Sequence, residues 1–136
     1  MFVVRRIVCG WVARENKILL VDRPHQPWKG YYGPPGGGVR KGENLKDAII
    51  REVFEETGLK VKVKRFMGSF VIRHQVGTDV RMYMFECEKV GGKLKARSDV
   101  NAVFWTKADA VLKLRVPSFL RDLVTGYDFK DVYEEK

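Results

Sequence analysis

The chain has 136 residues, 45% of them apolar, and a formal net charge of +9 at neutral pH. This length and composition predict a single domain, residues 1–136, and exclude a membrane-spanning helix because every apolar run is short. The N-terminal segment contains arginines and is typical of a strand rather than of a signal peptide. Two cysteines, Cys9 and Cys87, are too few for a disulfide framework, so we expect reduced thiols in a cytoplasmic protein.

The periodicity of apolar residues predicts strands and helices that mix without regular alternation. A loop rich in proline, glycine and aromatic residues leads to the first helix, which Asn44 and Gly58 are suited to begin and end. Further on, Gly91 and Gly92 indicate a hairpin turn. We therefore expect an α+β domain. The expected strands are 3–12, 17–22, 61–74, 79–90 and 102–106, and the expected helices are 45–57, 107–114 and 118–125.

Three carboxylates, Glu52, Glu55 and Glu56, crowd the last two turns of the first helix. Like charges four residues apart destabilise a helix, and the helix dipole adds roughly 0.3–1 kcal/mol of penalty for acids near its C-terminal end. A hard divalent cation such as Mg²⁺ or Mn²⁺ would relieve both penalties. The alternative interpretation is a solvated acidic face without a ligand.

The other residues of this helix define its remaining faces. On a wheel of about 100° per residue, Ile50, Val53 and Phe54 occupy an arc that is expected to face the core, with Ile49 on its border. Arg51 flanks the acids, where its guanidinium can bind a carboxylate through paired hydrogen bonds.

A glycine run, Gly36, Gly37 and Gly38, precedes the helix and allows the backbone to approach a ligand closely. Gly42 and Glu43 then lead into the helix. Such a loop followed by a helix can present backbone N–H groups and carbonyls to phosphate and metal. A plain turn would explain a glycine run alone, but its fixed spacing to an acidic helix favours a ligand site.

Gly37, Glu43 and "REVFEETGL" at 51–59 together resemble the Nudix box at every specified position. The resemblance extends to "KILLVDRP" and "YYGPPGG" before the box and to "SDVNAVFW" after it. It implies the Nudix fold, a mixed β-sheet sandwiched between α-helices. It also implies a metal-dependent hydrolase that cleaves a pyrophosphate linked to another moiety, often a nucleoside.

The resemblance assigns a role to each acid. It implies that Glu52, Glu55 and Glu56 bind Mg²⁺ or Mn²⁺ together with the backbone carbonyl of Gly36, and that Arg51 orients a glutamate. Bound metal lowers the pKa of a ligated water, and a glutamate takes the proton. Glu52 is the first choice for this base and Glu55 is the alternative.

Substrate contacts are expected from outside the helix. The resemblance implies that Arg23 contacts the phosphates and that Gly37 and Gly38 approach them through their backbone. Trp28 is a candidate for stacking on a base, and Asp99 is a candidate for the acid that some family members supply from a distant loop. The alternatives are a solvated strand end for Arg23, loop packing for Trp28 and a turn for Asp99.

The expected substrate is a nucleoside di- or triphosphate or a nucleoside diphosphate derivative. ADP-ribose, dinucleoside polyphosphates and RNA 5′ ends remain alternatives, although "RHQVGTD" lacks the proline or tyrosine typical of the first two classes. A non-catalytic Nudix-fold nucleotide-binding module is a further alternative, which the intact acids disfavour. Other nucleic-acid partners and membranes are not expected. By analogy with the family, an edge strand near the N-terminus leaves a homodimer open.

Overall fold

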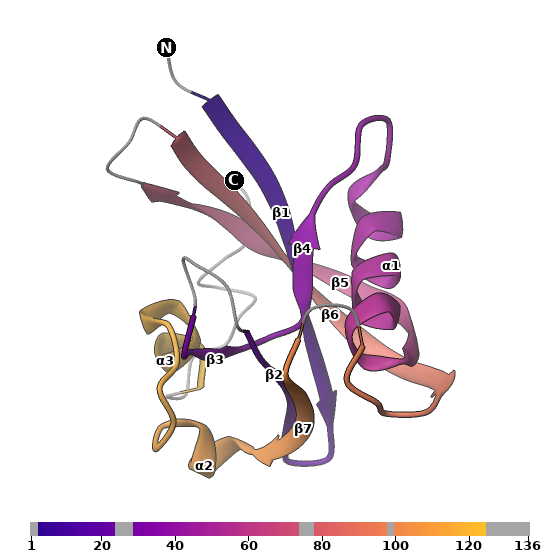
Figure 1. Cartoon of the computed structure of the whole chain (residues 1–136), viewed down its shortest axis with the longest axis vertical. Helices are drawn as coiled ribbons and strands as arrows, with labels where there is room; N and C mark the ends of the chain where they lie inside the picture. The colour runs from indigo at the N-terminus through magenta and orange to yellow at the C-terminus, as the bar shows by residue number, and fades with distance from the viewer. Residues whose placement is uncertain (1–2, 24–28, 74–77, 98–99, 125–136) are drawn as a thin grey trace.

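The computed structural model describes residues 3–23, 29–73, 78–97 and 100–124 (Figure 1). The candidate residues Trp28 and Asp99 lie outside these ranges. The strands are β1 (Val3–Arg14), β2 (Lys17–Asp22), β3 (Tyr32–Gly33), β4 (Gly36–Gly38), β5 (Leu59–Arg73), β6 (Thr78–Gly92) and β7 (Ala102–Lys107), and the helices are α1 (Leu45–Thr57), α2 (Ala108–Val111) and α3 (Ser118–Val124).

Within the described residues the strands form one mixed sheet of order β3-β2-β1-β6-β5, with β4 added beside β1 and β7 beside β2. The β1–β6 pair is parallel, and the other pairs are antiparallel. Helix α1 packs against β1, β4 and β5, while α2 and α3 lie at the other side of the view in Figure 1. This arrangement confirms the predicted α+β class.

Alternation along the strands supplies a core on both faces of the sheet. Val8 and Val12 of β1 join the apolar cluster beneath α1, whereas Cys9 between them joins a second cluster with Met82 and Met84. A third cluster forms where β2 meets α2 and α3. Helices are therefore needed on both sides of the sheet to exclude water from it.

Both ends of α1 are the predicted ones. The Oδ1 atom of Asn44 accepts a hydrogen bond from the backbone N–H of Asp47 at 2.8 Å, which caps the N-terminus. At the other end Gly58 has φ of 77°, and its N–H donates to the carbonyl of Phe54 at 2.9 Å. A Cβ on Gly58 would also collide with the carbonyl of Lys93, so glycine is required twice over.

The predicted core face of α1 is wrong by part of a turn. Ile49 and Val53 are fully buried with Ala48, but Ile50 and Phe54 are each 37% exposed. The guanidinium of Arg97 lies over the exposed ring of Phe54, 4.6 Å from its centroid. Because the buried arc is centred elsewhere, the carboxylates of α1 lie partly on the inward side of the helix.

Three further predictions are corrected by strand pairing. The loop before the helix contains β3 and β4, which form because the chain meets β2 and β1 there. Gly91 and Gly92 are not a hairpin turn, since they extend β6 and pair with Lys60 and Leu59. The predicted helix at 107–114 is regular only over α2.

The expected edge strand near the N-terminus is also wrong. Strand β1 pairs with β6 along one side, and with β4 and β2 along the other, so it lies inside the sheet. Cys9 and Cys87 are buried free thiols, as predicted. No helix in the described part of the chain is long and apolar enough to cross a membrane.

Candidate active site

The glycine run brings β4 into contact with two neighbours. Gly36 pairs with Cys9 of β1, and a Cβ on Gly36 would collide with the carbonyl of Val8. A Cβ on Gly37 would lie 2.6 Å from the carboxyl carbon of Glu52 on α1. The absence of both side chains therefore lets one short strand lie against the central strand and the acidic helix together.

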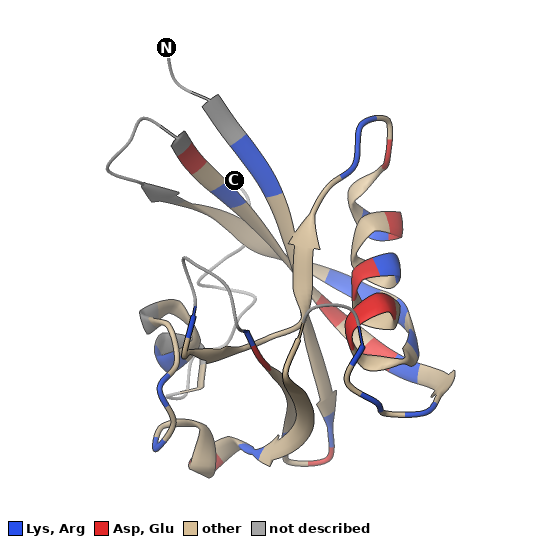
Figure 2. Ribbon diagram, viewed as in Figure 1, with Lys and Arg blue, Asp and Glu red and all other residues tan. Residues whose placement is uncertain are grey.

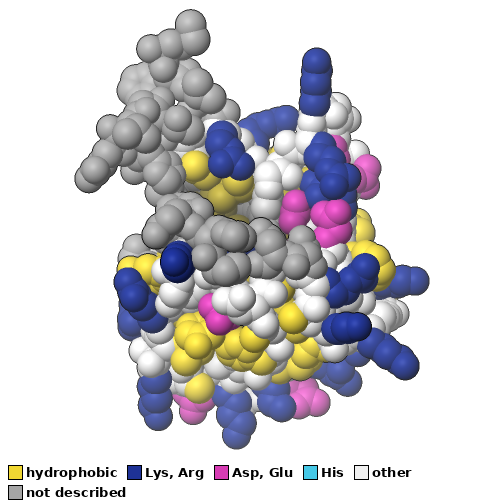
Figure 3. Space-filling model, in the orientation of Figure 1, with side chains coloured by type: hydrophobic (Ala, Val, Ile, Leu, Met, Phe, Trp, Pro, Cys, Tyr) yellow, Lys and Arg dark blue, Asp and Glu magenta, His cyan; other side chains and the backbone are white. Residues whose placement is uncertain are grey.

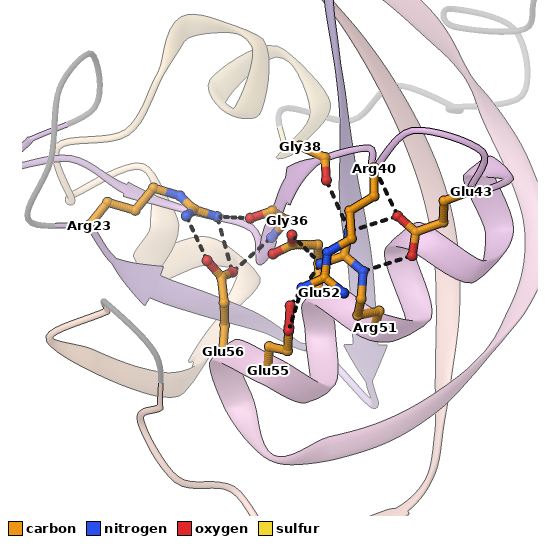
Figure 4. Close-up of polar contacts among 9 residues, drawn as sticks. All are labelled: Arg23, Gly36, Gly38, Arg40, Glu43, Arg51, Glu52, Glu55 and Glu56. Carbon is orange, nitrogen blue, oxygen red and sulfur yellow. Dashed lines mark hydrogen bonds and ion pairs between the residues drawn. The ribbon is translucent and has the colours of Figure 1, made fainter.

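Arg51 joins the acids of α1 to the loop before it (Figure 4). Its Nε and Nη2 donate to the two oxygens of Glu43 at 2.7 and 2.8 Å, a paired geometry. Its Nη1 donates to Glu52 at 2.8 Å and to Glu55 at 2.7 Å. A further bond, from Nη2 to the carbonyl of Gly38, measures 3.0 Å. One guanidinium thus sets the position of three carboxylates relative to β4.

Glu56 belongs to a separate and deeper group. Its side chain is 5% exposed, and its two oxygens accept bonds from Nη1 and Nη2 of Arg23 at 2.9 and 3.2 Å. The N–H of Gly36 donates to the same carboxylate at 2.9 Å. Nη2 of Arg23 also donates to the carbonyls of Pro34 and Gly36, at 3.0 and 3.1 Å. Arg23, which directly follows β2, therefore links this strand to β4 and to α1.

Burial dominates the electrostatics of the inner acids. Desolvation raises the pKa of both Glu52 and Glu56 above the ordinary range, although Arg51 and Arg23 oppose the shift. Hydrogen bonds from Arg51, and then from the backbone N–H of Arg40, lower the pKa of Glu43 to about 2. The fold thus holds two carboxylates where their charge is poorly solvated, and additional positive charge would be favourable.

The predicted residues of the box form two groups beside β4, one around Arg51 and the other around Arg23, and Gly38 contributes through its carbonyl only. Sequence reasoning missed Arg40, whose Nη2 contacts the second oxygen of Glu55 at 3.3 Å while its side chain stays 64% exposed. It also missed the carbonyl of Pro34. No spacing rule signals either contact, because both depend on how the loop folds back. Acidic and basic residues both colour the ribbon of α1 in Figure 2, and acidic side chains lie beside basic ones on the same side of the molecule in Figure 3.

The donors present suit a hard divalent cation. Carboxylate and carbonyl oxygens are the ligands that Mg²⁺ and Mn²⁺ prefer. As placed, no three acidic, histidine or cysteine side chains among the described residues converge closely enough to hold an ion. In this arrangement Arg51 bonds to Glu52 and Glu55, and Arg23 bonds to Glu56.

Comparison with known proteins identifies the class to which this fold and site belong. The model of the NUDIX domain family matches residues 3–126. The chain therefore belongs to the Nudix family. The sequence-based recognition, made on the box, is confirmed.

Relatives and solved structures agree with this assignment. The chain is 40% identical to an ADP-ribose pyrophosphatase of Methanocaldococcus jannaschii over 94 residues, 68% of this chain and 55% of that protein. It is 32% identical to a MutT-like protein of Streptomyces ambofaciens over 104 residues, 76% of this chain and 64% of that protein. The alignments thus span less than two thirds of either relative.

Two solved structures share the fold. A MutT protein from Methanosarcina mazei superposes with a TM-score of 0.78 at 24% identity, covering 90% of this chain and 91% of that one. The E. coli ORF135 protein superposes with a TM-score of 0.75 at 25% identity, covering 90% and 87%. The predicted Nudix fold is confirmed.

Proposed function

We propose that the protein is a Mg²⁺-dependent hydrolase that cleaves the pyrophosphate of a nucleoside diphosphate derivative or a nucleoside triphosphate. The observation that carries the proposal is the packing of Glu52 and Glu56 against the glycine strand β4. Burying carboxylates is unfavourable, and although Arg51 and Arg23 pair with these two acids, desolvation still raises the pKa of each above the ordinary range. These acids lie beside a glycine backbone that no side chain of its own covers. This arrangement suits the binding of a ligand.

The residues divide the work by position. Glu52, Glu55, Glu56 and the carbonyl of Gly36 would hold the metal, which when bound neutralises the pyrophosphate and acidifies a ligated water. Glu52 is the proposed base, because its carboxylate lies against the backbone of β4 and Arg51 fixes its orientation. Glu55 is the less suitable candidate, because its side chain is 37% exposed and also contacts Arg40, an exposed arginine of the preceding loop.

The identity of the substrate is the finer part of the proposal. The archaeal relative is named an ADP-ribose pyrophosphatase, which supports ADP-ribose as the first compound to test. Nucleoside triphosphates, the other class expected from the sequence, are the second. A cytoplasmic site of action is also proposed, supported by the two buried free thiols. RNA 5′ ends remain a third class to include in a screen because the chain is basic.

A product assay tests the activity. Purified protein is incubated with ADP-ribose, nucleoside triphosphates and 5′-triphosphate RNA, each with Mg²⁺ and with EDTA, and products are separated by anion-exchange chromatography. We expect Mg²⁺-dependent release of a nucleoside monophosphate, and we expect Glu52→Gln to remove it. Glu88→Gln is the matched control, because that acid contacts Lys62 on the exposed surface, away from the site.

Two outcomes would contradict the proposal. Turnover that is equal in Mg²⁺ and in EDTA would exclude the metal role. Nucleotide binding without turnover of any compound would favour the alternative of a non-catalytic Nudix module.

A further inference from the structure

We propose that Arg23 sets the metal affinity of this site, because its guanidinium holds the oxygen ligands when metal is absent and must leave them when metal binds. The inference rests on the metal site of the proposed function. It gives Arg23 a role in metal binding itself, in addition to the phosphate contact expected from the sequence.

The first support is the position of one nitrogen atom. Nη2 of Arg23 lies 3.0 Å from the carbonyl oxygen of Pro34, 3.1 Å from that of Gly36 and 3.2 Å from Oε1 of Glu56 (Figure 4). Nη1 lies 2.9 Å from the other oxygen of Glu56. A positively charged group thus sits among oxygens contributed by the glycine loop and by α1, as a bound cation would.

The second support is the overlap of ligands. The carbonyl of Gly36 and the carboxylate of Glu56 are two of the ligands proposed for the metal. Mg²⁺ requires its oxygens at about 2.0–2.1 Å in near-octahedral geometry. A guanidinium bonded to the same oxygens would occupy that space and repel the ion. Arg23 and the metal are therefore alternative partners of one ligand set.

The third support is burial. The side chain of Glu56 is 5% exposed, so its charge needs a cation beside it in both states of the site. Arg23 is suited to be the exchangeable partner because its own side chain is 21% exposed. Its backbone stays anchored by hydrogen bonds with Gly30 and Tyr31, so only the side chain needs to turn.

The contacts of Arg51 provide a comparison with those of Arg23. Its strongest contact is the paired one with Glu43, which lies outside the proposed ligand set. It can therefore keep its place while Glu52 and Glu55 bind an ion. Arg23 differs, because the carboxylate that it contacts at 2.9 and 3.2 Å belongs to the buried Glu56, which is itself one of the proposed ligands.

Metal titration without nucleotide tests the inference. Mg²⁺ and Mn²⁺ are titrated into wild type, Arg23→Ala and Arg65→Ala by isothermal calorimetry, and melting temperatures are recorded in EDTA and in saturating metal. Removing the competitor should tighten metal binding by at least about tenfold, lower the melting temperature in EDTA and enlarge the metal-induced increase. Arg65→Ala is the matched control, because Arg65 is 28% exposed and pairs with Glu86, which is not a proposed ligand, so we expect a change below about twofold.

The direction of the change separates the inference from a purely supporting role. If Arg23 only held Glu56 in place for the metal, Arg23→Ala would weaken metal binding, and weakened or unchanged affinity would overturn the inference. Should Arg23→Ala fail to fold, Arg23→Lys serves instead. A single ammonium cannot span both carboxylate oxygens and the carbonyls, so we expect tighter binding than wild type but a smaller change than for alanine. Unchanged or weaker binding in this variant would equally overturn the inference.

A structural readout is independent of affinity. The guanidinium N–H signals of Arg23, followed by ¹⁵N NMR, should shift or exchange away as Mg²⁺ is added, while those of Arg51 persist. Arg23 signals that stay unchanged at saturating Mg²⁺ would overturn the inference.

Glu56→Gln distinguishes failure of the inference from failure of the proposed function. If wild type and Glu56→Gln bind Mg²⁺ equally weakly, the metal site itself is wrong and both proposals fall. If Glu56→Gln loses the Mg²⁺ bound by wild type but Arg23→Ala does not tighten it, only the role of Arg23 is wrong.

Discussion

The inward and outward faces of α1 do not separate apolar from charged residues as the two faces of an ordinary amphipathic helix do. The inward face carries the buried Ile49 and Val53 but also the buried Glu56, whereas the outward face carries Ile50 and Phe54, each 37% exposed. An amphipathic helix normally turns its charges outward and its apolar groups inward. The orientation of α1 is therefore set by its site as well as by its core, since the acids must meet the glycine strand.

The largest effect is expected where the inward acids meet the loop. Gly37→Ala places a methyl group 2.6 Å from the carboxyl group of Glu52, so the carboxylate or the strand must shift. Turnover should fall by about a hundredfold in the product assay, because a displacement of this size spoils catalytic alignment. Stability should fall by about 1–3 kcal/mol in urea unfolding.

Gly33→Ala is the control for this substitution. It adds the same methyl group on the neighbouring strand β3, where no described atom lies within 4 Å. Turnover and stability should therefore stay near wild type. Equal losses in the two variants would show that the Gly37 effect is not specific to the site.

The second prediction compares the faces of α1 directly. Ile49→Ala removes fully buried methyl groups and should lower the free energy of unfolding by about 2–5 kcal/mol. Ile50→Ala, one residue on, removes the same atoms from a 37% exposed site and should cost less than about 1 kcal/mol. Urea titrations monitored by tryptophan fluorescence measure both. A larger loss of stability for Ile50→Ala than for Ile49→Ala would instead support the core face that the helical wheel predicted.

The third prediction concerns pH. Burial raises the pKa of Glu52 in the metal-free fold, so the unfolded chain loses this proton first as pH rises. Stability associated with Glu52 is therefore present below its ordinary pKa and is lost as pH rises through the raised value. In EDTA, Glu52→Gln should melt at a higher temperature than wild type, by a margin that grows above about pH 4.5.

Saturating Mg²⁺ should reverse this advantage, because the wild-type carboxylate then has a cation beside it. Thermal melts of both proteins across the pH range, with EDTA and with Mg²⁺, give the comparison. A margin that shrinks with rising pH in EDTA would contradict the assignment of desolvation as the dominant cause.

The smallest effect concerns the thiol nearest the inward acids. Burial, reinforced by Glu56 and Glu52 but opposed by Arg23, raises the pKa of Cys9 to about 12. At pH 8 the folded protein should therefore react slowly with thiol reagents, and both cysteines should react promptly in urea. Between pH 9 and 12 the unfolded thiol ionises first, so stability should fall there. Fast labelling of folded protein would show that this side of the sheet opens readily.

Local signals in the sequence were sufficient to predict α1 and both of its ends. Asn44 and Gly58 specify the ends of the helix through their own backbone and side-chain geometry, and the structure reproduces both. The spacing of the box acids is likewise a property of one continuous segment. These features involve residues close in the chain, so their energetics are visible without knowing what packs around them.

The pairing of strands that are distant along the chain could not be predicted from the sequence. Strands β3 and β4 exist because glycines meet β2 and β1, and Gly91 and Gly92 belong to β6 because β5 lies beside them. No local propensity distinguishes such glycines from a turn, since the deciding hydrogen bonds come from other parts of the chain.

By itself, the sequence determined the family, the helix that carries the proposed site and the set of acids on it. Only the tertiary structure decided which face of that helix is buried, and that Arg23 reaches across 33 residues to hold Glu56. The physical reason is that a buried carboxylate takes its partner from whatever the sheet brings alongside. That choice depends on strand order and register, which the spacing of residues along the chain does not record.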